Sequence, residues 1–274
     1  MISKNTGQLM KLGKKPPKED PRKNPKLLQL KKYLKKSAVL GGIPPVPAPD
    51  EVSWITKLAA AHALPMYLND QLGCCVEAAA AHCVQQWTFY AGKYTELSDS
   101  DVLKAYEDVG GYVPGDPSTD NGTNMLDFMH YWVTTGIGGH KIQQFAVVDW
   151  QNDNEVRLAI SLLGNVFTGI ALPTSVQGKD EWIVPEGGIY SDAGAPGGWG
   201  GHCIPFCAKS PITGTNITWG TTLKASYNFM HDYIDEMYVA LSPDWIMSNG
   251  LDPALVDIPR LREDLAEMGV VLAA

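Results

Sequence analysis

The chain has few cysteines and no long hydrophobic run, and both shortages limit what it can be. Its 274 residues include only five cysteines, an odd number that does not suggest a framework of disulfides. No apolar run reaches the roughly 18 residues that a membrane-spanning helix needs. The first ten residues are polar and lack a signal-peptide core, so the sequence predicts a protein that is neither secreted by a signal peptide nor membrane-bound.

Several motifs of cofactor and metal chemistry are also missing. The chain has no phosphate-binding loop, no dinucleotide-binding glycine fingerprint and no Gly-x-Ser-x-Gly. It has no Cys-x-x-Cys pair, and its cysteines and histidines fit no common zinc spacing, so we expect neither a metal nor a cofactor. Zinc ligation and redox activity of the adjacent Cys74 and Cys75 are the minor alternatives.

Positive charge is scarce except at one end of the chain. Residues 1–36 hold 12 of the 22 Lys and Arg residues and two acids, a net charge of 12 − 2 = +10. The rest holds 10 basic and 28 acidic residues, a net charge of 10 − 28 = −18. We expect residues 1–25 to be extended or disordered, followed by a basic amphipathic helix with Leu27, Leu30 and Leu34 on one face. This arm could pack on its own domain or bind an acidic partner, with nucleic acid less favoured.

The proline-rich segment 41–49 predicts a boundary near residue 50. We therefore expect an arm and linker over residues 1–50 and one folded domain over residues 51–274. Helical periodicity dominates the first half of the domain and strand patterns the second, with residues 227–236 ambiguous. Helices are predicted over residues 75–92, 97–109, 125–135, 154–163 and 259–269, and strands over residues 144–149, 165–172, 202–209, 215–219 and 237–241. This order predicts an α+β fold with a helical lobe, an antiparallel sheet lobe and a site between them.

The stretch from Asn69 to His82 carries the strongest candidate for chemistry. Turn-forming residues lead directly into an alanine-rich helix, and Cys74 and Cys75 lie at the junction. The positive end of a helix dipole lowers the pKa of a thiol placed there, and the thiolate is the nucleophile. The alternative is a buried thiol that only packs against the start of the helix.

Several motifs, in the same order along residues 60–245, resemble those of the papain-like cysteine peptidases. They are Gly73-Cys74-Cys75-Val76-Glu77-Ala78, Leu97-Ser98, Asn121-Gly122, Gly164-Asn165-Val166-Phe167-Thr168-Gly169-Ile170, Gly200-Gly201-His202-Cys203-Ile204 and Thr218-Trp219-Gly220. The resemblance implies the two-lobe papain-like fold, with the nucleophile on the first core helix and the catalytic histidine at the start of the sheet.

The same resemblance implies the roles of individual residues. Cys75 would be the nucleophile and His202 the general base, with Trp219 shielding the imidazole. The side-chain amide that stabilises the oxyanion would come from Asn69, six positions before the cysteine, or from Gln71. The substrate would lie along Asn121, Gly122 and Gly201.

One position departs from the family pattern. The asparagine that orients the catalytic imidazole is expected two residues before the tryptophan, and Ile217 stands there. The neighbouring Asn216 would point to the opposite face of the strand. Either a Cys–His dyad operates with Trp219 as a shield, or another group orients His202, or the site is inactive.

A closer likeness is to small papain-like proteins of bacteriophages and prophages. It rests on the patterns Asn-Asp-x-x-Gly-x-Cys, Trp-Gly-Gly-His and Tyr-x-Asp-Glu-x-Tyr, and it implies location in the virion or the host cytoplasm. Two functions follow. The first is a thiol hydrolase (peptidase, isopeptidase or amidase) that acts on a polypeptide or amide. The second is a non-catalytic virion structural or decoration protein that contacts other virion proteins through residues 1–50.

Overall fold

The computed structural model describes residue 7, residues 9–32 and residues 47–245. Its helices are α2 (Thr56–Ala61), α3 (Cys75–Tyr90), α4 (Asp99–Ala105), α5 (Met125–Thr134), α6 (Asp153–Leu163) and α7 (Tyr227–Tyr233). Its strands are β1 (Val52–Ser53), β2 (Gln144–Val147), β3 (Val166–Leu172), β4 (Glu181–Trp182), β5 (Gly200–Lys209), β6 (Thr213–Thr218), β7 (Thr221–Ser226) and β8 (Ile234–Leu241). Within this described part, no helix combines the length and the apolar character that crossing a membrane requires.

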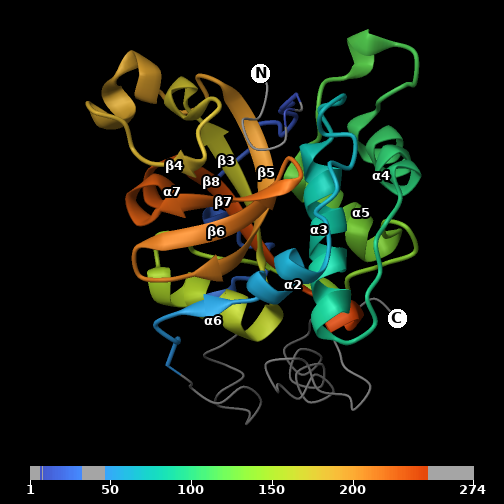
Figure 1. The fold of residues 1–274 in the computed structure, drawn as a ribbon, viewed down its shortest axis with the longest axis horizontal. Coiled ribbons are helices and arrows are strands. Elements are labelled where there is room, and N and C mark those ends of the chain that lie inside the picture. The colour runs from blue at the N-terminus through green and yellow to red at the C-terminus, as the bar shows by residue number, and fades with distance from the viewer. Residues whose placement is uncertain (1–6, 8, 33–46, 246–274) are drawn as a thin grey trace.

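The two predicted lobes are present. Figure 1 shows α3, α4 and α5 on one side and the sheet, with α6 and α7 against it, on the other. Helix α3 lies on the helical side next to the sheet, and all but two of its sixteen residues are buried. Its run Ala78–Ala81 has small side chains, which let neighbouring elements pack closely around the helix. One hydrophobic cluster fills the helical lobe and another fills the sheet lobe.

The sheet has the strand order β2-β8-β3-β5-β6-β7-β4, and β1 pairs with the far end of β5. All of these pairs are antiparallel except β4 with β7. In the centre of the sheet, β3 pairs with β5 so that Gly169 lies opposite Cys203 and Ile170 opposite His202. The α+β architecture predicted from the order of patterns is therefore confirmed.

Most predicted elements appear within a few residues of their expected bounds, because local caps define them. Ser98 forms a capping box with Asp101 at α4, and Asn124 and Asn152 cap α5 and α6. The helix predicted to reach residue 109 changes to a π-helical turn at Tyr106–Gly110. The ambiguous residues 227–236 divide into α7 and the start of β8. Strand β7 was not predicted, and the helix predicted over residues 259–269 lies outside the described residues.

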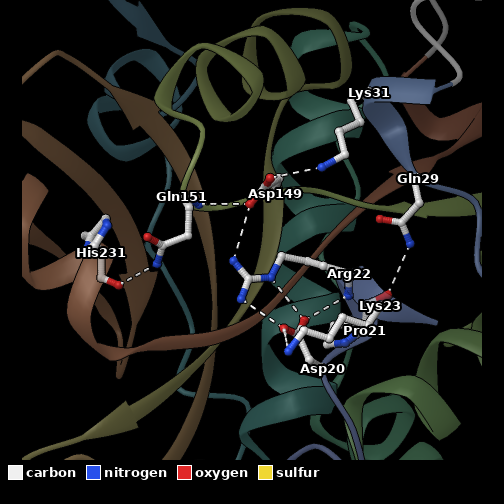
Figure 2. Close-up of polar contacts among 9 residues, drawn as sticks. All are labelled: Asp20, Pro21, Arg22, Lys23, Gln29, Lys31, Asp149, Gln151 and His231. Atoms are coloured by element: carbon white, nitrogen blue, oxygen red, sulfur yellow. Dashed lines mark hydrogen bonds and ion pairs between the residues drawn. The ribbon is translucent and has the colours of Figure 1, made fainter.

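The basic arm is attached to the domain by charged contacts (Figure 2). Arg22 binds the carboxylates of Asp20 and Asp149. Its guanidinium also lies 3.8 Å from the ring centroid of Trp150. Lys31 also reaches Asp149, at 3.1 Å. The described part of the arm thus packs on its own domain, which was one of the alternatives that the sequence left open. Leu30 is buried against the sheet lobe, while Leu34 lies outside the described residues.

Candidate active site

Cys75 begins α3 and is almost completely buried between the two lobes. Burial raises the pKa of its thiol to about 12, against the lowering effect of the backbone N–H groups of Cys203 and Gly13 that face the sulfur. The helix start was expected to lower this pKa, but the loss of water around the sulfur outweighs the helix dipole. The covering residue is Gly13, which belongs to the arm.

His202 directly precedes Cys203 on β5, the residue whose backbone N–H faces the Cys75 thiol. Its ring stacks on Trp219, with centroids 4.2 Å apart and planes inclined by 9°. Its Nε2 lies 2.7 Å from Thr218 Oγ1, whereas its buried Nδ1 has no hydrogen bond within the described part of the chain. Burial lowers the pKa of His202 to about 3, so the ring is neutral in this state.

The partner of His202 is a residue that the sequence interpretation missed. Ile217 packs in a small hydrophobic cluster with Cys207, as an apolar side chain should. Thr218, the next residue, faces the histidine and supplies a hydroxyl where an amide was expected. The alternation of β6 puts Asn216 and Thr218 on one face, yet no described residue hydrogen-bonds to the Asn216 side chain. Position alone could have suggested Thr218, since it is the polar residue next to Trp219.

The two candidates for the oxyanion amide lie in different surroundings. Asn69 is buried; its side chain donates to the carbonyl of Leu72 at 3.2 Å, and its own carbonyl accepts from the N–H of Lys11. Gln71 is exposed to solvent. Asn69 is therefore the candidate that lies against the covered part of the cleft. The backbone N–H of Cys75 is the second available donor, since the first turn of a helix has no internal acceptors for its N–H groups.

Residues 10–15 of the arm cross the candidate site as an extended segment. The N–H of Thr123 donates to Gly13 O at 2.7 Å, and the N–H of Lys15 donates to Thr123 O at 3.0 Å. From the other lobe, Gly201 O accepts from the N–H of Lys14 at 3.1 Å. Both walls of the cleft thus pair with the backbone of one extended chain.

Two of the three residues predicted to bind substrate lie directly under this segment. A side chain at Gly122 would overlap the carbonyl of Gly13, and one at Gly201 would overlap the carbonyl of Lys14. Gly122 also has φ +74°, which only glycine adopts readily. The third residue, Asn121, is exposed and donates to Ser118 O. The arm backbone and a substrate backbone could not occupy this place together.

A buried carboxyl group supports the wall beneath the arm. Glu77, in the first turn of α3, accepts a 2.6 Å hydrogen bond from Thr123 Oγ1, and burial raises its pKa from 4.5 to about 7. Because the folded-state pKa is raised, the contribution of Glu77 to stability is greatest below pH 4.5 and is lost as the pH rises through 7.

We expect Glu77→Gln to remove this pH dependence. The variant should match the wild type near pH 4 and exceed its free energy of unfolding by about 3 kcal/mol at pH 8. Urea unfolding at both pH values measures the difference, and the exposed Glu186→Gln serves as the control. Equal pH dependence in wild type and Glu77→Gln would contradict the assignment.

The described residues contain no group of three or more His, Cys, Asp or Glu side chains arranged to hold a metal ion. All five cysteines are buried and free of disulfides. Cys74 directly precedes α3 and its thiol donates to Tyr67 O, while the thiol of Cys83 donates to Asn165 Oδ1. These side chains are used in packing between elements.

No protein-family model and no curated protein sequence matches this chain. Solved structures do match. The chain is similar to xylellain, a cysteine protease from Xylella fastidiosa, at 12% identity and a TM-score of 0.60, over 85% of this chain and 97% of xylellain. It is similar to proCathepsin B S9 from Trypanosoma congolense at 9% identity and a TM-score of 0.54, over 86% and 87% of the two chains. Procathepsin L 3 from Tenebrio molitor larval midgut matches at 13% identity and a TM-score of 0.53, over 77% and 79%.

At these identities the comparisons define the fold. It is the two-lobe papain-like α+β fold, with a helical lobe and a mostly antiparallel sheet. These neighbours are papain-like cysteine proteases. The fold that the resemblance implied is confirmed, and the roles of the individual site residues stay predictions.

Proposed function

We propose that this chain is a thiol hydrolase of papain-like type that cleaves polypeptides, with Cys75 as nucleophile and His202 as base and acid. The observation that carries the proposal is the extended segment 10–15, which pairs with both walls of the cleft while its backbone covers Cys75. A cleft that holds one extended chain over a thiol suits a polypeptide substrate. The papain-like fold supports the same chemistry by analogy.

The reaction follows from the roles proposed for these two side chains. His202 Nδ1, which has no hydrogen-bond partner among the described residues, takes the proton of Cys75 Sγ in this proposal. The thiolate attacks the carbonyl carbon, forming a C–S bond, and the C–N bond breaks as His202 returns the proton to the leaving amine. Water then hydrolyses the thioester. The Cys75 N–H and the Asn69 amide are the candidate donors to the oxyanion.

Thr218 replaces the orienting asparagine in this proposal. With Nε2–H donating to Thr218 Oγ1, the ring keeps Nδ1 unprotonated and able to accept the thiol proton. Trp219 excludes water from one face of the ring and also donates from Nε1 to Lys11 O. The dyad prediction is thus replaced by a proposed triad of Cys75, His202 and Thr218.

The covered state shown here is inactive in this proposal. Burial holds Cys75 as a neutral thiol and His202 as a neutral imidazole. Removal of segment 10–15 would admit water and substrate and reverse both effects of burial on the pKa values. The arm must therefore leave the cleft before catalysis.

Peptide cleavage by the full chain tests the proposal. A synthetic peptide mixture is incubated with a Lys14→Ala variant, in which a contact that holds the arm is removed, and products are identified by mass spectrometry. We expect products that disappear in Lys14→Ala/Cys75→Ala and persist in Lys14→Ala/Cys83→Ala. Two results would contradict the proposal: cleavage products that persist in Lys14→Ala/Cys75→Ala, or the absence of products in all of these variants. Absence throughout would favour the alternative of a structural protein, for which a virion setting stays a sequence-based prediction.

A further inference from the structure

Lys14 is a lysine with no exposed side-chain surface, and it points into an acidic pocket next to the candidate site. Its Nζ lies 2.8 Å from Asp235 Oδ2 and 3.1 Å from Glu236 Oε1. Glu236 is also buried, and Asp235 is 26% exposed. Buried lysines are rare unless they are paired with an opposite charge. The two carboxylates around this ammonium group supply that opposite charge.

The pocket is built mainly by strands β3 and β8 of the sheet lobe. Tyr238 Oη donates to Glu236 Oε2 at 3.0 Å, so β8 fixes the carboxylate from the side away from Lys14. Gly169 on β3 leaves the space through which the lysine passes, since a side chain there would overlap Lys14 Cε, Glu236 Cγ and Met125 Sδ. The strand pairing of β3 and β8 shifts register at this point, between Gly169 and Ile170.

The electrostatic balance of the pocket favours a cation. Burial raises the pKa of Glu236, and the ammonium of Lys14 acts against that rise. Burial alone would lower the pKa of Lys14, yet the carboxylates of Glu236 and Asp235 outweigh it and the pKa is raised. An apolar side chain in the same place would leave a buried carboxylate without its counter-charge, which is costly.

The position of the pocket relates it to catalysis. The N–H of Gly13 faces the Cys75 thiol, and Lys14 is the next residue along the arm. The pocket therefore receives the side chain one residue away from the backbone that lies over the nucleophile. A substrate bound in place of the arm would offer a side chain to the same pocket.

We propose that the pocket formed by Asp235, Glu236 and Gly169 is a specificity pocket that selects a lysine or arginine side chain of the polypeptide substrate, with Lys14 as its resident occupant. This inference rests on the proposed function for its biological meaning, but the preference for a basic side chain can be measured by binding alone. The occupant is positioned by backbone pairing on both sides, as a substrate residue would be.

Binding is measured with the full chain carrying Lys14→Ala and Cys75→Ala, which loosens the arm and prevents turnover. The probes are fluorescein-labelled peptides that copy residues 9–18, with the lysine at position 14 kept, changed to arginine or changed to leucine. We expect leucine to weaken binding by about 30-fold or more, since it leaves a buried charge unpaired. Arginine should bind comparably to lysine. A peptide with Lys11 changed to leucine, which loses one charge outside the pocket, should bind within about twofold of the parent.

Variants of the protein complete the test. Glu236→Gln should remove most of the preference for lysine over leucine, whereas the exposed Glu186→Gln should leave it intact. Equal binding of the lysine and leucine peptides, or the same loss with Glu186→Gln, would overturn the pocket assignment and make the Lys14 contacts purely structural.

Cleavage separates this inference from the proposed function. In Lys14→Ala, products of a peptide mixture should share a Lys or Arg at one fixed distance from the cut. Binding that prefers lysine without any cleavage would retain the pocket and overturn the peptidase. Cleavage with no preference for a basic residue would retain the peptidase and overturn the pocket.

Discussion

Lys14→Ala should make Cys75 react with iodoacetamide about 100-fold faster than in the wild type. The substitution leaves two carboxylates facing the arm without their cation, which costs the covered state about 3 kcal/mol, while the uncovered state regains water around them. The population with an accessible thiol should rise by the corresponding factor. Intact-protein mass spectrometry follows the alkylation rate, and peptide mapping shows whether Cys75 is the modified residue.

Arg22→Ala is the matched control for this prediction. It also removes a cationic contact between the arm and the domain, but the Arg22 side chain is 26% exposed and its pairs with Asp20 and Asp149 are reached by water. Such pairs contribute up to about 1 kcal/mol, so the rate should change by less than about fivefold. Equal rates in wild type and Lys14→Ala, with the fold retained by circular dichroism, would show that the lysine does not hold the arm over the thiol.

Thr218→Val should lower kcat by about 100-fold with little change in KM. Valine has nearly the shape of threonine but cannot accept the Nε2–H of His202, so the ring loses the contact that fixes its tautomer and direction. Because Thr218 acts through the imidazole, the loss should appear in turnover, and the pH profile of kcat should shift with it. Measurement uses the Lys14→Ala background and a fluorogenic peptide identified by the cleavage test.

Thr218→Ser provides the rescue, since it keeps the hydroxyl and should retain activity within about fivefold of threonine. His202→Ala sets the lower limit, with an expected loss of at least about 1000-fold, because the proton acceptor itself is removed. Equal losses in Thr218→Val and Thr218→Ser would indicate a packing effect and would overturn the orienting role. Full activity in Thr218→Val would leave the dyad that was first predicted.

The sequence allowed the fold to be predicted because its signals are local. Alanine-rich periodicity after Gly73 predicts α3, and in the structure side-chain caps at Ser98 and Asn124 define where α4 and α5 begin. The short strand β7 escaped prediction because its alternation spans only six residues next to Trp219 and Gly220. Its partner β6 was predicted, as a strand over residues 215–219.

The site was predictable only in part, for the same reason. Cys75 and His202 were named from motifs, and the structure brings Cys203 N–H against the Cys75 thiol, next to His202. The group that orients His202 was left open, because Ile217 stands at the position where the family pattern has an asparagine. The sequence shows that Ile217 is apolar and cannot hydrogen-bond to His202. That Thr218 faces the ring depends on the register of β6 against β5.

By itself, the sequence determined the α+β class, the order of the two lobes, the cysteine at the start of α3 and the basic character of the arm. Tertiary structure alone decided that residues 10–15 cover Cys75, that Lys14 is buried against Asp235 and Glu236, and that both catalytic candidates are neutral in this state. The positive charge of residues 1–36 indicates that the arm binds acidic groups. The carboxylates that Lys14 contacts lie more than 200 residues away in the sequence. Their position depends on the pairing of β3 with β8 and on burial, which no local pattern encodes.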